Sequence, residues 1–86
     1  TLAAQITQEM GKPLHSSLAE IEKCAWLCRH YALESKHYVQ SKIILTEKQK
    51  TYVTFQPLGL VFGIMPWNFP FWQVFRFAIP TIMAGN

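Results

Sequence analysis

The sequence has few acidic residues and no run of basic ones. Its 86 residues include eight Lys and Arg against five Asp and Glu, which gives a formal net charge of +3. A nucleic-acid surface would need Lys and Arg clustered on one face. Most of the basic residues are instead scattered over residues 12–50, where glutamates interrupt them. This pattern is typical of a solvated helix face, so we expect no nucleic-acid partner.

Long uninterrupted apolar runs are also missing. Residues 58–84 are apolar enough to raise a membrane-associated segment as an alternative. Five residues interrupt this segment: Pro66, Asn68, Pro70, Arg76 and Pro80. A spanning helix needs about 20 apolar residues in a row, and prolines near its middle would break it. We therefore expect no membrane partner, and instead a buried strand followed by a buried helix.

Cysteine is scarce, with only Cys24 and Cys28 in a helical pattern. Residues four apart share a helix face, which suits neither a relaxed disulfide nor a zinc knuckle, and two ligands do not complete a zinc site. We expect reduced, buried, structural thiols and no metal. Reduced thiols indicate a cytoplasmic location, and the N-terminus lacks the apolar core and cleavage site of a signal peptide.

Apolar residues, by contrast, make up half of the chain. A chain of this length buries a limited share of its surface. We therefore expect an exposed apolar patch, self-association or a larger parent protein. The sequence opens on Thr1 within a helical pattern and stops at Asn86 without a tail, so we expect an internal piece of a longer chain. An alternative is a small α+β interaction module that binds a partner through its exposed apolar surface.

Two helices are predicted in the first part of the chain. In residues 2–10 apolar side chains recur every four positions, and Gly11 is a suitable C-cap. A second helix of about five turns should end near residues 34–36. It begins either at a capping box of Ser17 and Glu20 or earlier, with Pro13 in its first turn. Its expected buried stripe is Leu14, Leu18, Ile21, Ala25, Cys28 and Ala32, widened by Leu27 and Tyr31.

A β-hairpin is predicted next. Residues 42–45 and 51–55 are rich in β-branched and aromatic side chains, and the polar residues 46–50 separate them. In the second run polar and apolar residues alternate, as in a half-buried strand.

The remaining residues predict a strand, a loop and a helix. Residues 60–65 form the continuous apolar run of a central parallel strand covered on both faces. Residues 66–70 are too rich in proline for a regular element. A helix should follow over residues 71–83, kinked at Pro80 and ending near Gly85.

Asn68 is the candidate functional residue in that loop. In open α/β sheets, ligands bind beyond the carboxyl ends of strands and near helix N-termini. A buried amide there must find a partner or offer one to a ligand. The alternative is that Asn68 only holds its own loop together, because Asn is a common turn residue.

Several segments resemble the aldehyde dehydrogenase superfamily. They are residues 57–59, residues 64–70 (Ile-Met-Pro-Trp-Asn-Phe-Pro), Pro80 and residues 84–86, with residues 9–13 (Glu-Met-Gly-Lys-Pro) upstream. The Pro-Trp-Asn-Phe-Pro string is highly specific, and the resemblance covers nearly the whole chain. Residues 71–76 look most like the succinate-semialdehyde dehydrogenase branch.

This resemblance implies an α/β chain that is part of a Rossmann-like fold. Residues 1–40 would be the helical part of the N-terminal cofactor-binding region. Residues 41–57 would be the hairpin of the oligomerisation element, and residues 58–86 the start of the dinucleotide-binding core. The full-length protein would form homodimers or homotetramers.

The resemblance also implies a reaction. An NAD- or NADP-dependent enzyme would oxidise an aldehyde, with succinate semialdehyde as the favoured substrate, to a carboxylate through a cysteine thiohemiacetal. Asn68 would donate its side-chain N–H to the thiohemiacetal oxyanion. The catalytic cysteine, the general-base glutamate and a cofactor-binding lysine would lie beyond Asn86, so this chain alone should be inactive.

The remaining site residues are also implied by the resemblance. The cofactor-binding residues would be Ile64, Met65, Pro66, Trp67 and Asn68. Trp67 could equally be packed in a core. Arg76 would bind the distal carboxylate of the substrate. The alternative for Arg76 is a structural salt bridge to a residue outside this chain, since a charge among apolar residues needs a partner.

Overall fold

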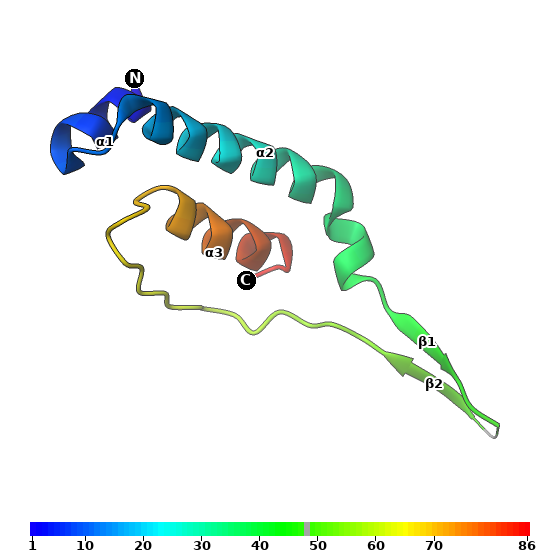
Figure 1. Cartoon of the computed structure of the whole chain (residues 1–86). Coiled ribbons are helices and arrows are strands. Elements are labelled where there is room, and N and C mark those ends of the chain that lie inside the picture. Colours follow the sequence, from blue (N-terminus) through cyan, green and yellow to red (C-terminus); the bar gives the residue numbers. More distant parts are fainter. Residues whose placement is uncertain (48) are drawn as a thin grey trace.

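The computed structural model describes residues 1–47 and 49–86. Its elements, in chain order, are α1 (Leu2–Met10), α2 (Leu14–Val39), β1 (Lys42–Leu45), β2 (Lys50–Val53) and α3 (Trp72–Met83). The molecule is elongated, with extents of 62 × 24 × 17 Å. Helix α2 is the longest element and runs along most of the molecule. Helix α1 folds against one end of it, α3 lies alongside it, and the hairpin projects from its other end (Figure 1). The arrangement leaves little room for a central core.

Helix α1 ends as predicted. Gly11 adopts a left-handed conformation with a φ of 72°, and its N–H donates to the carbonyl of Thr7 at 3.0 Å. A glycine enters this conformation without the steric cost that a Cβ imposes. Ala3 and Ile6 are buried, so α1 packs its apolar side against α2.

Helix α2 begins at Leu14 and ends at Val39, so the earlier of the two predicted starts is correct. The carbonyl of Pro13 accepts the N–H groups of Ser16 and Ser17, each at 3.0 Å, and this nucleates the first turn. The end expected near residues 34–36 is wrong, because the helix continues to Val39. The His30 ring and the Tyr38 hydroxyl, separated by 2.7 Å, stabilise this last part.

The buried face of α2 differs from the predicted stripe. Leu14, Leu18, Ala25 and Ala32 are exposed in this chain. The buried residues are Ser17, Glu20, Cys24, Leu27 and Ser35. The prediction failed because polar side chains with hydrogen-bond partners occupy this face. The Ser17 hydroxyl lies 2.9 Å from that of Thr7 on α1, for example. Hydrophobic periodicity does not detect a polar group that is buried because it is paired.

The predicted hairpin is present. Strands β1 and β2 are antiparallel, with Lys42 opposite Val53 and Leu45 opposite Lys50. The second strand begins one residue earlier and ends earlier than predicted, and the expected loop includes Lys48, which lies outside the described residues. Both strands are exposed on both faces, so the half-buried alternation is not seen in this chain.

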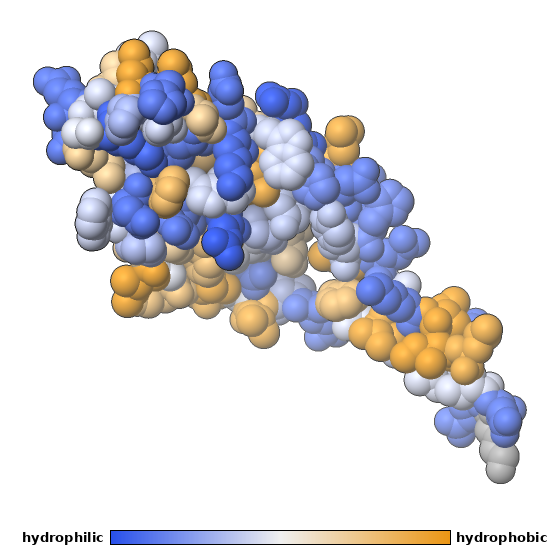
Figure 2. Space-filling view, viewed as in Figure 1, coloured by the Kyte–Doolittle hydropathy of each residue, from blue (hydrophilic) through white to orange (hydrophobic). Residues whose placement is uncertain are grey.

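The strand predicted over residues 60–65 is absent from the part of the chain that the structure describes. A central strand needs hydrogen-bonded neighbours on both edges and layers on both faces, and residues 1–47 and 49–86 supply neither. Leu60, Phe62 and Ile64 are therefore largely exposed. Figure 2 shows apolar side chains gathered on the hairpin and along the lower edge of the molecule. The chain as it stands combines helices with a two-stranded antiparallel sheet, which is compatible with one piece of an α/β protein.

Helix α3 forms close to its predicted bounds, with Pro80 inside it. The expectation that this helix is buried is wrong for this chain, because none of its residues is buried. The side chain of Asn86 fastens its end to the preceding segment: Oδ1 accepts the N–H groups of Leu58 at 2.6 Å and Gly59 at 3.0 Å, and Nδ2 donates to the carbonyl of Thr81. None of the helices within the described residues is long and apolar enough to cross a membrane.

Replacing Gly11 by Ala should lower the free energy of unfolding of the full-length protein by about 1 kcal/mol. A Cβ at this position meets no atom within 4 Å, so the cost comes from the left-handed backbone alone. Gly11→Asn should cost less, because Asn tolerates this conformation better. Urea unfolding midpoints measure both changes, and an Ala variant as stable as the original protein would contradict the explanation.

Candidate functional site

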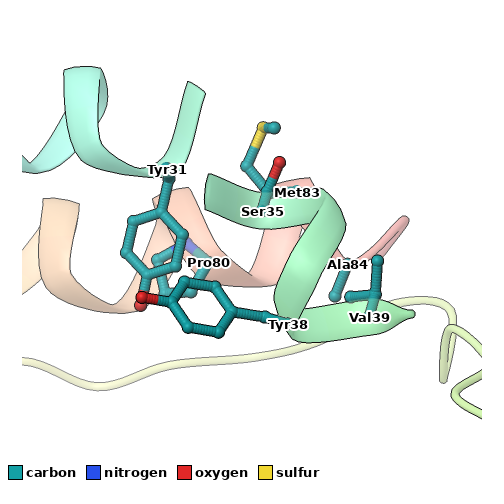
Figure 3. Close-up of a pocket in the computed structure, with 7 residues that line it drawn as sticks. All are labelled: Tyr31, Ser35, Tyr38, Val39, Pro80, Met83 and Ala84. Atoms are coloured by element: carbon teal, nitrogen blue, oxygen red, sulfur yellow. The ribbon is translucent and has the colours of Figure 1, made fainter. Parts of the chain in front are cut away.

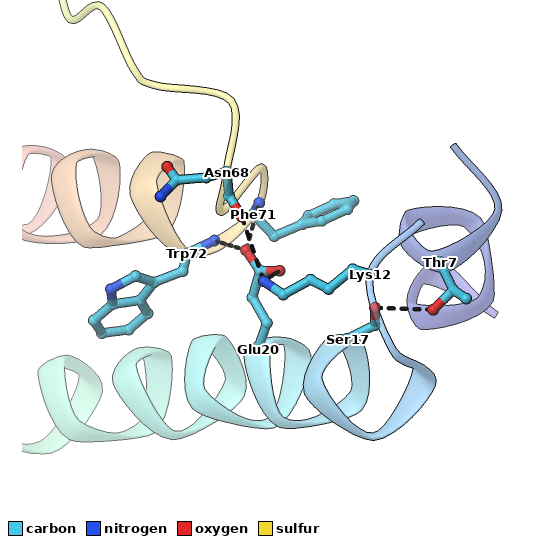
Figure 4. Close-up of polar contacts among 7 residues, drawn as sticks. All are labelled: Thr7, Lys12, Ser17, Glu20, Asn68, Phe71 and Trp72. Carbon is cyan, nitrogen blue, oxygen red and sulfur yellow. Dashed lines mark hydrogen bonds and ion pairs between the residues drawn. The ribbon is translucent and has the colours of Figure 1, made fainter. Parts of the chain in front are cut away.

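The loop over residues 66–71 is fastened to α2 by one carboxylate. The side chain of Glu20 is 1% exposed, and its Oε1 accepts the backbone N–H groups of Phe71 at 3.2 Å and Trp72 at 3.0 Å (Figure 4). Phe71 is the N-cap of α3, but its own side chain makes no capping hydrogen bond. Glu20 therefore satisfies N–H groups that a helix leaves open at its N-terminus, and its negative charge suits the positive end of the helix dipole.

Lys12 completes this attachment. Its Nζ lies 3.2 Å from Oε2 of Glu20 and donates to the carbonyl of Asn68 at 3.4 Å. It also lies 3.9 Å from the centroid of the Phe69 ring, a cation–π distance. Both oxygens of the Glu20 carboxylate thus have partners, as a buried charge requires. Lys12 and Glu20 together hold the loop along its path into α3.

A pocket of about 330 Å³ adjoins these contacts. It lies between α2 and the start of α3, and its charged lining residues are Lys12, Glu20 and Lys23. The Nζ of Lys23 lies 4.0 Å from the centroid of the Trp72 ring. Two aromatic rings near the loop therefore each face an ammonium group.

The sequence did not single out Glu20 and Lys12 for this role. Glu20 was predicted only as one residue of a capping box and of the solvated helix face. A usable signal was present, since Ser17, Glu20, Cys24 and Leu27 follow one another at helical spacing on a single face. A charged residue within a run of buried positions indicates a partner elsewhere in the fold.

Asn68 was expected to be buried, and in this chain it is exposed. Its carbonyl is held by Lys12, and its side chain makes no hydrogen bond within the described residues. Asn68 is exposed because no layer covers the loop on this side within the described residues. In Figure 4 the amide points away from Lys12 and Glu20. The backbone of Asn68 is therefore fastened while its amide faces outward.

The other predicted site residues fall into two groups. Ile64, Met65 and Arg76 line a pocket of about 340 Å³ together with Gly63 and residues of α3. Pro66, Trp67 and Asn68 belong to the loop and do not line this pocket, and the Trp67 side chain is 81% exposed. Gly63 lies against α3 so closely that a Cβ there would be 2.6 Å from Cε1 of Phe77. This close approach keeps the segment 63–65 beside Arg76.

Arg76 is exposed on α3. The expectation that it needs a partner is not met inside this chain, because Arg76 makes no ion pair among residues 1–47 and 49–86. Its guanidinium group is therefore accessible at the pocket that Ile64 and Met65 line.

Cys24 and Cys28 are both free, with Cys24 buried and Cys28 partly buried. Burial raises the pKa of the Cys24 thiol above its ordinary value. The carboxylate of Glu20 and the sulfur of Cys28 add to the rise, while Lys23 opposes it. A nucleophilic cysteine needs the opposite shift, so Cys24 is a structural thiol. Across the described residues, no three His, Cys, Asp or Glu side chains are grouped to hold a metal ion.

Another pocket, of about 220 Å³, lies between the C-terminal turns of α2 and α3. Tyr31, Tyr38 and Pro80 are among the residues that line it (Figure 3). The two tyrosine rings are 5.8 Å apart. None of the residues that line it is charged, and none of them was predicted as a site residue, so this pocket is a weaker candidate than the loop.

Comparison with known proteins identifies the class. The model of the aldehyde dehydrogenase family matches residues 1–86, and the chain therefore belongs to that family. It is 49% identical over 84 residues to a Synechocystis protein named as a probable NADP(+) succinate-semialdehyde dehydrogenase, covering 98% of this chain and 18% of that protein. It is 46% identical over 85 residues to an NAD(P)+ succinate semialdehyde dehydrogenase of Escherichia coli, covering 99% and 18%.

A Mycobacterium avium protein named as an NADP(+) succinate-semialdehyde dehydrogenase is also similar. It is 46% identical over 88 residues, covering 99% of this chain and 19% of that protein. The chain thus spans about a fifth of the length of these relatives. The predicted resemblance to the family is confirmed.

Cys24 should be alkylated by iodoacetamide more slowly in the native full-length protein than after unfolding in urea. Its raised pKa keeps the thiolate fraction low near pH 8, and its rate should climb as the pH rises further. Peptide mass spectrometry over a pH series gives the rate, with Cys28, which is less buried, as the internal control. A native rate equal to the unfolded rate would contradict the assignment.

Proposed function

We propose that this chain is part of an NAD(P)-dependent aldehyde dehydrogenase that oxidises an aldehyde to a carboxylate. The observation that supports this most directly is Asn68. The chain belongs to the aldehyde dehydrogenase family. The amide of Asn68 faces outward just before α3, while Lys12 and Glu20 hold the loop around it. A free amide on a fastened backbone is what an oxyanion donor requires.

The chemistry begins with a cysteine thiolate supplied by the rest of the protein. The thiolate forms a C–S bond to the aldehyde carbon, and the π electrons of the carbonyl move to its oxygen. Asn68 donates its side-chain N–H to that oxyanion, which lowers the energy of the tetrahedral thiohemiacetal and of the transition state before it. A bound nicotinamide would supply the hydride acceptor, and loss of hydride from the carbon would leave a thioester on the cysteine. Water activated by a carboxylate outside this chain then releases the acid.

Residues 64–68 are proposed to line the cofactor site. The side chains of Ile64 and Trp67 are 83% and 81% exposed, and the backbone of residues 60–65 forms no strand within the described residues. Apolar side chains beside backbone groups suit the rings and hydroxyls of a dinucleotide. In the full-length protein we propose that residues 60–65 join the sheet of a Rossmann-like domain, which residues 58–86 form together with other segments of that protein.

Succinate semialdehyde is the proposed substrate. The Synechocystis, Escherichia coli and Mycobacterium avium relatives carry this substrate in their names. Arg76 supplies the matching chemistry, since an accessible guanidinium group can bind a carboxylate through two parallel hydrogen bonds. An anchored carboxylate at one end of the substrate would orient the aldehyde at the other end.

The proposal extends to the assembly. The apolar side chains of β1 and β2 are exposed, and we propose that the hairpin, residues 41–57, is buried in a homodimer or homotetramer. Residues 1–40 are proposed to support the cofactor-binding region. The free cysteines suit a reducing, cytoplasmic compartment. The isolated chain, without nucleophile and base, should be inactive. The alternative of a small interaction module is not favoured, because the family match spans residues 1–86.

Asn68→Ala in the full-length enzyme should lower kcat by about 10² to 10³, the usual cost of losing one oxyanion donor. Steady-state assays with NAD and with NADP measure the change. Gln5→Ala removes an exposed amide from α1 and is the matched control. Unchanged turnover of the Asn68 variant would overturn the role assigned to this residue.

Arg76→Leu should raise KM for succinate semialdehyde far more than KM for an uncharged aldehyde of similar length. The reason is that only the charged substrate loses a carboxylate partner. Arg29→Leu, which removes an exposed guanidinium group from α2, provides the control for net charge. Equal effects of Arg76→Leu on both substrates would instead favour a structural salt bridge.

A further inference from the structure

We propose that Glu20 and Lys12 are positioning residues that set the place of the Asn68 amide through the backbone of its loop. The inference rests on the proposed function, in which Asn68 is the oxyanion donor. Neither residue is assigned any contact with the substrate. Their role is to fix the segment between Asn68 and the start of α3 relative to the long helix α2.

Glu20 fixes the C-terminal end of this segment. Its Oε1 accepts two consecutive backbone N–H groups, those of Phe71 and Trp72, from a side chain that is 1% exposed. These residues follow Asn68 by three and four positions, so the chain between them has little slack. Pro70 restricts it further, since its φ is locked and it has no N–H of its own. A shift of the Glu20 carboxylate would therefore move the Asn68 Cα.

Lys12 fixes the N-terminal end of the segment. Its Nζ reaches the carbonyl of Asn68 itself, at 3.4 Å, while it pairs with Oε2 of Glu20 at 3.2 Å. The ammonium group also lies against the Phe69 ring. The peptide after Asn68 is thus held by a hydrogen bond that originates 56 residues away in the sequence. Both ends of the segment 68–72 are therefore held, which restrains the backbone on the C-terminal side of Asn68.

A neutral pair would not reproduce the role of this ion pair. The Lys12 charge compensates the buried Glu20 carboxylate, which would otherwise be costly to keep ionised. In Glu20→Gln the amide oxygen is neutral and therefore a weaker acceptor for the two N–H groups of α3, and the new amide N–H₂ would face the Lys12 ammonium. Because two hydrogen-bond donors would then face each other, the Lys12 ammonium would move away from the side chain at position 20. It would also lose its hydrogen bond to the Asn68 carbonyl. A displacement of about 1 Å at a catalytic group can cost about 10² in rate.

The test is a double-mutant cycle in the full-length enzyme. Glu20→Gln should lower kcat by about tenfold to a hundredfold, with little change in KM for the aldehyde or in Kd for the reduced cofactor measured by fluorescence. In an Asn68→Ala background the same substitution should cost nothing further, because the group it positions is gone. Rates are normalised to titrated catalytic thiols, so that loss of folded enzyme does not count as loss of turnover.

Companion variants keep the test decisive. Lys12→Met retains the apolar stem and removes the charge, and it should show the same dependence on Asn68. Lys12→Arg should recover part of the lost rate. Glu22→Gln, an exposed neighbour on α2, is the matched control and should be neutral. If Glu20→Gln does not fold, the Lys12→Met cycle decides the question. Hydrogen exchange at the Phe71 and Trp72 amides gives a readout independent of turnover and should accelerate in Glu20→Gln.

The possible failures can be told apart. If Asn68→Ala is slow but Glu20→Gln and Lys12→Met lower its rate by the same factors as in the original enzyme, the positioning role is wrong and the proposed function stands. If Asn68→Ala has full turnover, the oxyanion role of Asn68 and the positioning role of Glu20 and Lys12 are both wrong. Unchanged exchange at Phe71 and Trp72 in Glu20→Gln would also overturn the positioning role.

Discussion

A buried carboxylate on one helix capping the N-terminus of another is the contact on which this structure depends. Helix α3 has no side-chain cap of its own, so Glu20 on α2 takes over the task that an N-cap side chain usually performs. Local caps fix only where a helix begins. A cap supplied from 51 residues away also fixes where that helix lies. The start of α3, and the loop before it, are therefore located relative to α2 by a hydrogen-bonded charge.

The small apolar core increases the importance of that contact. Only Ala3, Ile6, Cys24 and Leu27 are buried apolar residues in the described part of the chain, and apolar packing of this extent is weakly directional. Hydrogen bonds to a charged group are stronger and more directional than neutral ones. Around the loop, geometry is thus set by polar contacts, while the apolar side chains of the hairpin and of residues 58–64 are mostly exposed in this chain.

Local patterns predicted the elements well where the elements are self-contained. Helix α1 with Gly11 and the hairpin each depend on neighbours close in sequence, and both formed near their predicted bounds. Helix α3 also formed near its predicted bounds, although Glu20 of α2 caps its N-terminus. The strand over residues 60–65 did not form, because no other strand lies beside it within the described residues. The buried face of α2 was mispredicted for another reason: Ser17 and Glu20 are buried by their partners, and partners distant in sequence leave no periodic signal.

The same distinction explains what the sequence revealed about the candidate site. A short, specific string pointed to Asn68, but nothing within that string indicates what holds it in place. The support comes from the other segment that carries the family resemblance, residues 9–13, through Lys12. In the fold these two segments meet, since the Lys12 ammonium contacts Glu20, the Asn68 carbonyl and the Phe69 ring. Residues 9–13 and the loop before α3 look independent in the sequence, but in the fold they form one contact. This contact requires both Lys12 and the loop to keep their positions.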